Sequence, residues 1–201
     1  MKNILLLITI ASFLSCSDGN RVAEIGKKIP DYSFNEILNK DNKPFKLNNR
    51  DKPIIIEFWT TWCSPCIPAM KKLENYQEKY GNEIEFITVS TDTKKNLNKY
   101  IENTGTTLRV AFDTTHLKVF NYKYIPHTVL IDKNGIVRAI TTPTKITDQV
   151  IDDLIKGKTI NIKETVTEVS NLNLNKEFKN NDYQYKLTSE NKKMSFKNEI
   201  K

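Results

Sequence analysis

The sequence predicts an α/β fold in which a central mixed sheet carries helices on both faces. Strongly apolar runs at 54–59 and 84–89 are typical of strands that are buried on both faces. Each run is followed by a segment with apolar side chains at helical spacing, at 66–80 and 94–103. A hairpin signal at 133–135 joins two further strand-like segments. Because strands alternate with helices, the sheet is expected to be covered on both faces.

The remaining elements complete this pattern. Residues 25–47 are rich in turns and contain short alternating stretches, which predict an N-terminal β extension. The strands on either side of the hairpin signal are predicted at 128–132 and 136–140. A helix is predicted after them, and its apolar side carries Ile146, Val150, Ile151, Leu154 and Ile155. Residues 158–201 are polar, and we expect an extension that forms short strands or is partly disordered.

Length and composition restrict the class of protein. The 201 residues leave room for one domain and an appendage. A hydrophobic content of 38% with 27% charged residues excludes collagen-like, coiled-coil and, for most of the length, disordered proteins. The net charge is +7, but only four of the 31 basic residues are Arg, and these four are scattered. Nucleic-acid sites favour clustered Arg, so we expect no nucleic-acid partner.

The N-terminal residues predict export from the cytosol. Lys2 precedes an apolar run at 4–14. As a helix this run would rise only about 16 Å, whereas the hydrocarbon core of a bilayer is about 30 Å thick. A short apolar run after a positive charge is typical of a secretory signal peptide, which we assign to residues 1–15.

The end of this segment resembles the lipobox of bacterial lipoproteins. In a lipobox a small residue, here Ser15, precedes a cysteine, here Cys16, that carries lipid and becomes the mature N-terminus. Phe13 departs from the pattern, since Leu is usual there. An exported protein with three cysteines leaves one unpaired, and lipid on Cys16 would remove that odd thiol. Residues 16–24 would then be a lipid-anchored tether; the alternative is cleavage near Cys16 without lipid.

The segment Trp62-Cys63-Ser64-Pro65-Cys66 carries the predicted chemistry, because it joins a buried strand to a helix. A thiol at a helix N-terminus faces free backbone N–H groups and the positive end of the helix dipole, which favour its thiolate. Cys63 is therefore the predicted nucleophile. Cys66, one turn later and shielded, is predicted to attack the mixed disulfide and release the product.

Two other interpretations of this cysteine pair are weaker. It could be half of a zinc site, but the chain has no second cysteine pair, and its only histidines are His116 and His127. It could also be an inert structural disulfide. A position between a strand and a helix in an α/β pattern favours a redox role. We expect neither a cofactor nor a metal ion, and a structural role for His116.

Two segments resemble the landmarks of a known superfamily. Residues 57–66 resemble the active-site segment of thioredoxins, and residues 124–135 are similar to the second landmark of the same superfamily. Together with residues 25–32, they resemble the TlpA-like branch of exported thiol–disulfide oxidoreductases, which is related to the redoxin and AhpC/TSA proteins. The resemblance implies a thioredoxin-like domain at 25–157.

The resemblance also implies roles for single residues. Pro126 matches the family's cis-proline, which packs against the disulfide and lets a partner chain pair with the adjacent backbone. Substrate contacts are accordingly expected at Trp62, Ile125, Pro126 and His127; for His127 the alternative is a surface residue without a role. Glu57, six residues before Cys63, matches a buried acid of thioredoxins. Burial raises the pKa of such a carboxyl, which can then accept the proton of Cys66.

The helix after the cysteines departs from the family pattern. Many TlpA-like proteins have Glu three residues after the second cysteine, where this chain has Ala69. The helix-kinking proline of thioredoxins is replaced by Lys71, although Pro68 lies nearby. Glu57 is therefore the only obvious proton acceptor that we expect.

The leading functional hypothesis is a thiol–disulfide oxidoreductase that is tethered to a membrane on the periplasmic side of the bacterial cell envelope. It would exchange or reduce disulfides of exported partner proteins and receive electrons from a membrane donor. The resemblance suggests cytochrome c maturation as the process. Ser64-Pro65 lacks the histidine of strong oxidants of the DsbA kind, which favours a reductant.

Three alternatives have their own sequence criteria. A thiol peroxidase would have Thr three residues before the reactive cysteine and Pro four residues earlier; Thr60 fits, but Ile56 does not. A copper-handling module could use the two cysteines and His127, but its relatives generally place three residues between the cysteines. A non-catalytic lipoprotein adaptor would work through the extension that begins at Lys158.

Overall fold

The computed structural model describes residues 22–40, 43–48 and 50–162, together with four short strands near the C-terminus. Cys16 lies outside the described residues. The predicted signal peptide and most of the predicted tether also lie outside them, so these assignments stay predictions.

The chain divides into two compact units, Met1–Ile162 and Lys163–Lys201. In the second unit, β8 pairs with β9 and β10 pairs with β11, and both pairs are antiparallel. In chain order the bounds of these strands are Phe178–Asn180, Tyr183–Tyr185, Ser189–Glu190 and Lys193–Met194.

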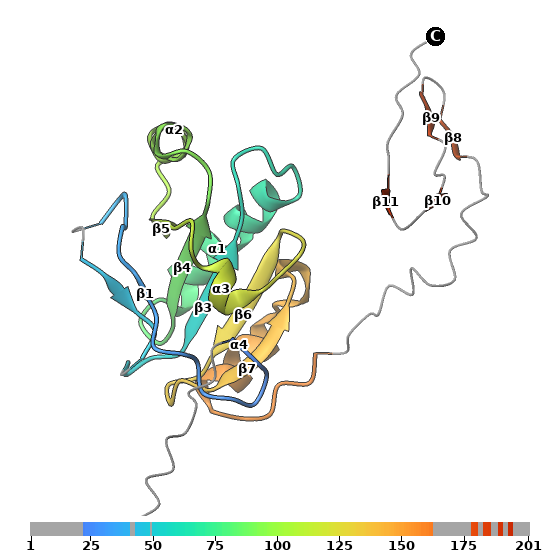
Figure 1. Ribbon diagram of the computed structural model, residues 1–201. Helices are drawn as coiled ribbons and strands as arrows, with labels where there is room; N and C mark the ends of the chain where they lie inside the picture. The colour runs from blue at the N-terminus through green and yellow to red at the C-terminus, as the bar shows by residue number, and fades with distance from the viewer. Residues whose placement is uncertain are drawn as a thin grey trace, which may run out of the picture. The chain divides into compact units, whose positions relative to one another are not determined.

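The first unit is built around a five-stranded mixed sheet (Figure 1). The strands lie in the spatial order β5-β4-β3-β6-β7. Their bounds in that order are Arg109–Phe112, Glu85–Ser90, Ile54–Phe58, His127–Ile131 and Val137–Thr141. β4 is parallel to both β3 and β5, whereas β6 is antiparallel to both β3 and β7. The mixed α/β sheet that the sequence predicts is confirmed, and β5 is a strand that the sequence analysis does not predict.

β3 is buried along its whole length because it has a neighbouring strand on each side and a packed layer on each face. Successive side chains of a strand point to opposite faces. Ile54, Ile56 and Phe58 accordingly belong to one apolar cluster, and Ile55 belongs to the other. Glu57 alternates with Phe58 and therefore lies on the same face as Ile55.

Helices cover both faces of the sheet, and Figure 1 shows α1 and α3 on opposite sides of it. The helices are α1 (Cys66–Tyr80), α2 (Lys94–Thr104), α3 (Leu117–Phe120) and α4 (Asp148–Ile155), with a 3₁₀ turn, η1 (Pro143–Lys145), before α4. Buried residues of α1, α2 and α4 share one apolar cluster with Ile55. α3 packs on the other face with the N-terminal segment.

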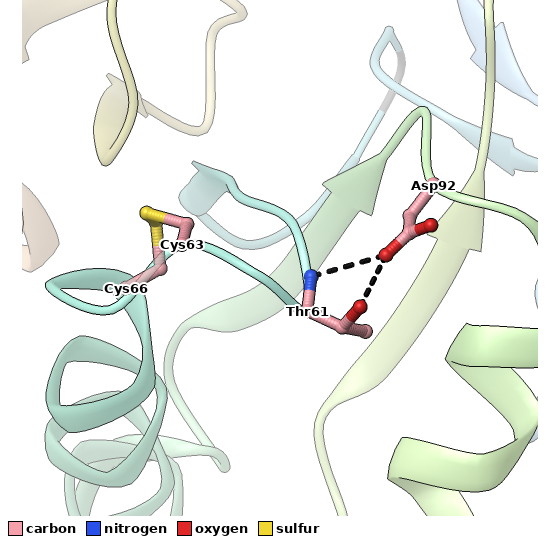
Figure 2. The surroundings of a disulfide bond; sticks show 4 residues. All are labelled: Thr61, Cys63, Cys66 and Asp92. Carbon is pink, nitrogen blue, oxygen red and sulfur yellow. Dashed lines mark hydrogen bonds between the residues drawn. A yellow bond between two sulfur atoms is a disulfide. The ribbon is translucent and has the colours of Figure 1, made fainter. Parts of the chain in front are cut away.

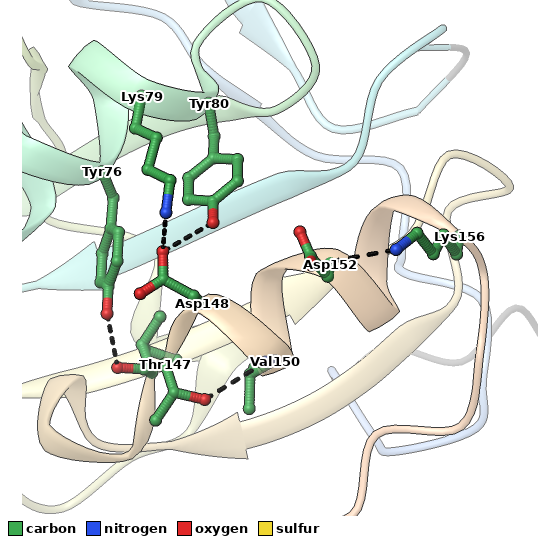
Figure 3. Close-up of polar contacts among 9 residues, drawn as sticks. Tyr76, Lys79, Tyr80, Thr147, Asp148, Val150, Asp152 and Lys156 are labelled. Atoms are coloured by element: carbon green, nitrogen blue, oxygen red, sulfur yellow. Dashed lines mark hydrogen bonds and ion pairs between the residues drawn. The ribbon is translucent and has the colours of Figure 1, made fainter.

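Polar contacts fix the end of α1 against the start of α4 (Figure 3). Asp148 accepts hydrogen bonds from Lys79 (2.5 Å) and from the hydroxyl of Tyr80 (2.6 Å). The hydroxyl of Tyr76 donates to the carbonyl oxygen of Ile146 (3.1 Å). Since α1 begins at Cys66, these contacts help to set the direction of the helix that carries the cysteine.

The N-terminal segment contributes a two-stranded extension. β1 (Ser33–Phe34) and β2 (Phe45–Lys46) pair in antiparallel fashion. Phe34 and Phe45 are buried against the face of the sheet that carries Phe58. This arrangement confirms the predicted β extension.

The same segment reaches both outer strands of the sheet. Ile37 forms an isolated bridge with β5, and the side-chain oxygen of Asn39 accepts a hydrogen bond from the backbone N–H of Val110 (3.0 Å). At the opposite edge, the backbone N–H of Val137 donates to the carbonyl oxygen of Lys27 (2.9 Å). The extension thus covers part of each sheet edge.

Candidate active site

The two predicted redox cysteines form a disulfide with an S–S distance of 2.06 Å and a Cα–Cα distance of 5.3 Å (Figure 2). Cys63 lies in the turn after β3, and Cys66 is the first residue of α1, with Pro65 as the N-cap. The backbone N–H of Cys66 donates to the carbonyl oxygen of Cys63 (2.9 Å). The turn therefore places one sulfur just before the helix and the other inside its first turn.

The two cysteines differ in their access to solvent. Cys63 is 5% exposed, whereas Cys66 is 0% exposed and packs in the apolar cluster that contains Trp59 and Met70. Trp62, beside Cys63, is 74% exposed. The small exposed area of the pair therefore belongs to Cys63, which follows an exposed indole in the chain.

A carboxylate that the sequence analysis did not identify holds the turn before Cys63. The backbone N–H of Thr61 donates to Oδ2 of Asp92 (3.3 Å), and the Thr61 hydroxyl donates to the same oxygen (Figure 2). The other oxygen of Asp92 accepts hydrogen bonds from the backbone N–H of Thr93 (2.7 Å) and from the side chain of Asn96 (3.0 Å). Asp92 thus links the turn at the end of β3 to the start of α2.

These hydrogen bonds also determine the charge of Asp92. Partial burial opposes ionisation, but the hydrogen bonds from Thr61, Asn96 and Thr93 outweigh it and hold the pKa of Asp92 below its usual value.

Asp92 follows β4, which is parallel to β3, so the carboxyl ends of both strands meet at one edge of the sheet. This edge is where functional groups of α/β proteins gather, and it is the signal by which Asp92 could have been found.

Glu57 is fully buried in the middle of the sheet. Thr128 lies directly opposite on β6, and its hydroxyl donates to Oε2 of Glu57 (2.5 Å). Oε1 has no hydrogen-bond partner among the residues that the structure describes. Burial raises the pKa of Glu57 well above its usual value, and the hydrogen bond from Thr128 opposes this only in part. The side chain lies on the face of β3 that is covered by α1.

The loop between α3 and β6 carries the predicted cis-proline, since the peptide bond between Ile125 and Pro126 is cis. Ile125 is partly buried and packs against the apolar cluster that contains both cysteines. Tyr124, which the sequence analysis passed over, is 75% exposed in the same loop. An aromatic residue next to a predicted substrate-binding proline is the signal that could have singled it out.

His127, the fourth predicted substrate contact, is only partly exposed. Its ring stacks on Tyr122 with the ring centroids 4.8 Å apart. Burial lowers the pKa of His127 to about 4, so the imidazole is neutral at pH 7. His116 is fully buried and packs on Phe58, as expected for a structural residue. Among the described residues, no group of three or more His, Cys, Asp or Glu side chains is arranged to hold a metal ion.

Comparisons with known proteins agree with this geometry. Residues 25–140 match the profile of the AhpC/TSA family. The chain belongs to this family. Over 154 residues it is 30% identical to the thiol-disulfide oxidoreductase ResA of Geobacillus thermodenitrificans, a match that covers 72% of this chain and 87% of the relative.

Solved structures show the same fold. A crystal structure from Bacteroides vulgatus, described as a thiol-disulfide oxidoreductase, is 28% identical with a TM-score of 0.55, over 68% of this chain and 97% of that one. A thiol:disulfide interchange protein DsbE from Chlorobium tepidum is 24% identical with a TM-score of 0.54, over 60% and 86% of the two chains. The resemblance to the thioredoxin superfamily and its TlpA-like branch is confirmed, and the protein is a thiol–disulfide oxidoreductase.

Replacing Asp92 tests its hold on the turn before Cys63. Asp92→Ala leaves both donors of Thr61 without their acceptor, so we expect the free energy of unfolding to fall by about 1 kcal/mol. We also expect slower alkylation of Cys63 in the reduced protein, since its thiol is no longer held at the helix start. Urea unfolding and the alkylation rate measure the two effects.

Two further variants serve as controls. Asp92→Asn keeps one acceptor oxygen and should recover part of the stability and part of the alkylation rate. The matched control is Asp51→Ala, at an exposed position before β3. Equal effects of Asp92→Ala and Asp51→Ala would contradict the role of Asp92.

Proposed function

We propose that this protein is exported, anchored to a membrane, and reduces or exchanges disulfides of other exported proteins through Cys63 and Cys66. The observation that supports this most directly is the unequal burial of the two cysteines, because Cys63 keeps a small exposed area (5%) whereas Cys66 is fully buried at the start of α1. A cysteine at the surface that attacks first and a buried cysteine that attacks second suit two successive exchange steps, since the exchange rate depends on access.

In the first step, the thiolate of Cys63 attacks one sulfur of a partner disulfide. The partner S–S bond breaks, a mixed disulfide forms between Cys63 and the partner, and the other partner sulfur leaves as a thiolate. In the second step, Cys66 loses its proton and attacks the sulfur of Cys63. The mixed disulfide breaks, the second partner sulfur is released as a thiolate, and the Cys63–Cys66 disulfide forms. Two electrons have then moved to the partner.

Glu57 is the proposed acceptor of the Cys66 proton. Both groups lie on the side of the sheet that α1 covers, and one oxygen of Glu57 is free of hydrogen bonds within the described part of the chain. The raised pKa of the buried carboxyl brings its proton affinity closer to that of a thiol, which makes the transfer less unfavourable. Cys63 needs no such base, because the start of α1 already favours its thiolate.

The proposed docking surface surrounds Cys63. It consists of the exposed side chain of Trp62 and of the loop with Ile125 and Pro126, where an extended partner chain would pair with the backbone. The exposed Tyr124 belongs to the same loop and would add an aromatic contact. His127 would contribute its backbone at the start of β6, since its ring lies on Tyr122.

Repeated turnover requires that the Cys63–Cys66 disulfide is reduced again, and a membrane electron donor is the proposed source. The proposed process is cytochrome c maturation, as the TlpA-like resemblance suggests. Membrane attachment would come from lipid on Cys16, as the resemblance of the segment before it to a lipobox suggests. No helix in the described part of the chain is long and apolar enough to span a bilayer.

The reduction potential of the Cys63–Cys66 pair tests the direction of electron flow. We expect a value nearer to about −270 mV, as in a reductase, than to about −120 mV, as in an oxidase of dithiols. Equilibration with glutathione redox buffers gives the value. A potential at the oxidising end would contradict the proposal of a reductase.

Replacing each cysteine separately tests their order of action. Cys63→Ser should abolish turnover, because the accessible nucleophile is lost. Cys66→Ser should keep the first step and accumulate mixed disulfides with partners, because the resolving thiol is lost. Mass spectrometry of trapped complexes measures this difference. If the two reduced thiols are alkylated at equal rates at pH 6, the assignment is wrong.

Replacing Glu57 tests its role as the proton acceptor. Glu57→Gln cannot accept a proton, so the mixed disulfide should decay more slowly while its formation is unchanged. Stopped-flow measurements at pH 7 separate the two steps. If the decay rate is unchanged and the variant is less stable, Glu57 has a structural role instead.

The same variant should change how stability depends on pH. Because the pKa of Glu57 is raised on folding, the folded state binds its proton more tightly than the unfolded state, whose carboxyl has a pKa of about 4.3. Stability is therefore lost as the pH rises above that value. The gain in stability from Glu57→Gln should accordingly be larger at pH 8 than at pH 5.

Replacing Cys16 tests the membrane anchor. Cys16→Ser should release the protein from membranes and leave its redox chemistry unchanged, because the anchor and the active site lie on separate segments. Membrane fractionation and the mass of the mature N-terminal peptide measure this. If the wild-type mature chain carries no acyl mass, the lipoprotein assignment is wrong.

A further inference from the structure

The loop that carries the cis-proline is closed at its base by two aromatic rings. Tyr122 precedes the loop and His127 follows it, and their rings stack with centroids 4.8 Å apart and planes 23° apart. Within the described residues, the backbone N–H groups of 122–125 donate to no other backbone group. The shape of the loop therefore depends on side-chain contacts, and these two rings contact each other directly across its ends.

Tyr122 is itself held by a buried histidine. Its hydroxyl lies 2.6 Å from Nε2 of His116, and Nδ1 of His116 lies 2.8 Å from the carbonyl oxygen of Asp113. A carbonyl oxygen can only accept a hydrogen bond, so Nδ1 carries the hydrogen of the neutral ring. Nε2 is then the acceptor, and the Tyr122 hydroxyl is the donor. Burial keeps both groups neutral, because it lowers the pKa of His116 and raises the pKa of Tyr122.

These rings form one stack on Phe58 of β3. The Phe58 ring lies 4.9 Å from His116, 4.8 Å from Tyr122 and 5.9 Å from His127. Phe58 precedes the turn to the cysteines and pairs with His127 across the strands. The stack therefore connects the two ends of the loop to β3, the strand that precedes the turn with Cys63.

Apolar packing alone does not require the polar pair in this stack. A hydrocarbon side chain at position 116 could fill the cluster without burying an imidazole, whereas buried polar groups are costly unless they are hydrogen-bonded. The bond from Tyr122 to His116 fixes the position of the phenol ring, and that ring then supports His127. Phe120, the last residue of α3, gives a reference, because within the described residues its ring packs on Phe58 at 4.7 Å and on Phe34 but contacts neither Tyr122 nor His127.

We propose that Tyr122 is a positioning residue for partner binding. Hydrogen-bonded to His116 and stacked on His127, it sets the shape of the loop on which the partner chain docks. This inference rests on the proposed docking role of the loop. The exchange steps take place at the cysteines, which belong to the cluster on the other face of β3, although the charge of Glu57 contributes to the raised pKa of Tyr122. Loss of the stack should therefore weaken recognition of a protein disulfide and leave the cysteine chemistry unchanged.

Steady-state reduction of insulin, with dithiothreitol as the reductant, measures recognition of a protein disulfide. Tyr122→Leu removes both the ring and the hydrogen bond, and we expect the KM for insulin to rise roughly tenfold, because the partner must then order the loop as it binds. Tyr122→Phe keeps the ring and its volume, loses only the hydrogen bond, and should raise KM about twofold to threefold. In both variants kcat should stay within about twofold of the wild-type value.

Two further readouts separate positioning from general damage. The reduction potential should be unchanged, because the stack does not contact the cysteines. The single-turnover rate with oxidised glutathione should also be unchanged, because each half of this disulfide is a tripeptide, too short to lie along the loop as a protein chain would. Phe120→Leu is the matched control, since it removes a ring from the same cluster. It should lower stability without raising the KM for insulin.

Several results would overturn the inference. One is an equal rise in KM for Phe120→Leu and Tyr122→Leu. Another is an equal loss of the insulin and glutathione reactions in Tyr122→Leu, or an unchanged KM in both Tyr122 variants. Pro126→Ala tests the docking role on its own: if its KM for insulin is unchanged, the proposed docking surface is wrong. If only the Tyr122 variants are without effect, the docking surface stands and the inference about Tyr122 fails.

Discussion

The rest of the structure depends on the burial of β3 on both of its faces. A strand with a neighbour on each side and a layer on each face has one position and one register, because a shift of one residue would exchange the two sets of side chains. That register delivers Cys63 to the start of α1, buries Glu57 on the side of α1, and sets Phe58 beside His127. The redox pair and the docking loop are thus located by a single strand.

The two faces of β3 carry different parts of the function. Glu57 and the cysteines share the face that α1 covers, and the aromatic stack occupies the other. Burial of a carboxyl with one unpaired oxygen is unfavourable, and the hydrogen bond from Thr128 offsets only part of this cost. The proposed chemistry and the proposed recognition thus lie on opposite faces of one strand, and the charge of Glu57 contributes to the raised pKa of Tyr122 on the other face.

The parts of the fold with local sequence signals could be predicted. Continuous apolar runs, helical periodicity and the hairpin signal identified the long elements, and the predicted strand ends differ from the observed ones by about one residue. The spacing of the cysteines identified the redox pair. β5 was missed because it is a four-residue edge strand that begins with a partly exposed Arg109. Asp92 and Tyr122 were missed for another reason. The partner of Asp92 is 31 residues away along the chain, and the contacts of Tyr122 need both α3 and β6 in place.

The N-terminal extension has a consequence for self-association. An open sheet has two edge strands with unpaired backbone groups, and these can pair with the edges of other molecules. Here the extension occupies part of both edges, through Ile37 and Asn39 at β5 and through Lys27 at β7. A chain that began after residue 40 would expose both edges at once. The extension therefore protects the folded domain against strand-to-strand aggregation, which would matter most if the proposed lipid anchor concentrates copies on one surface.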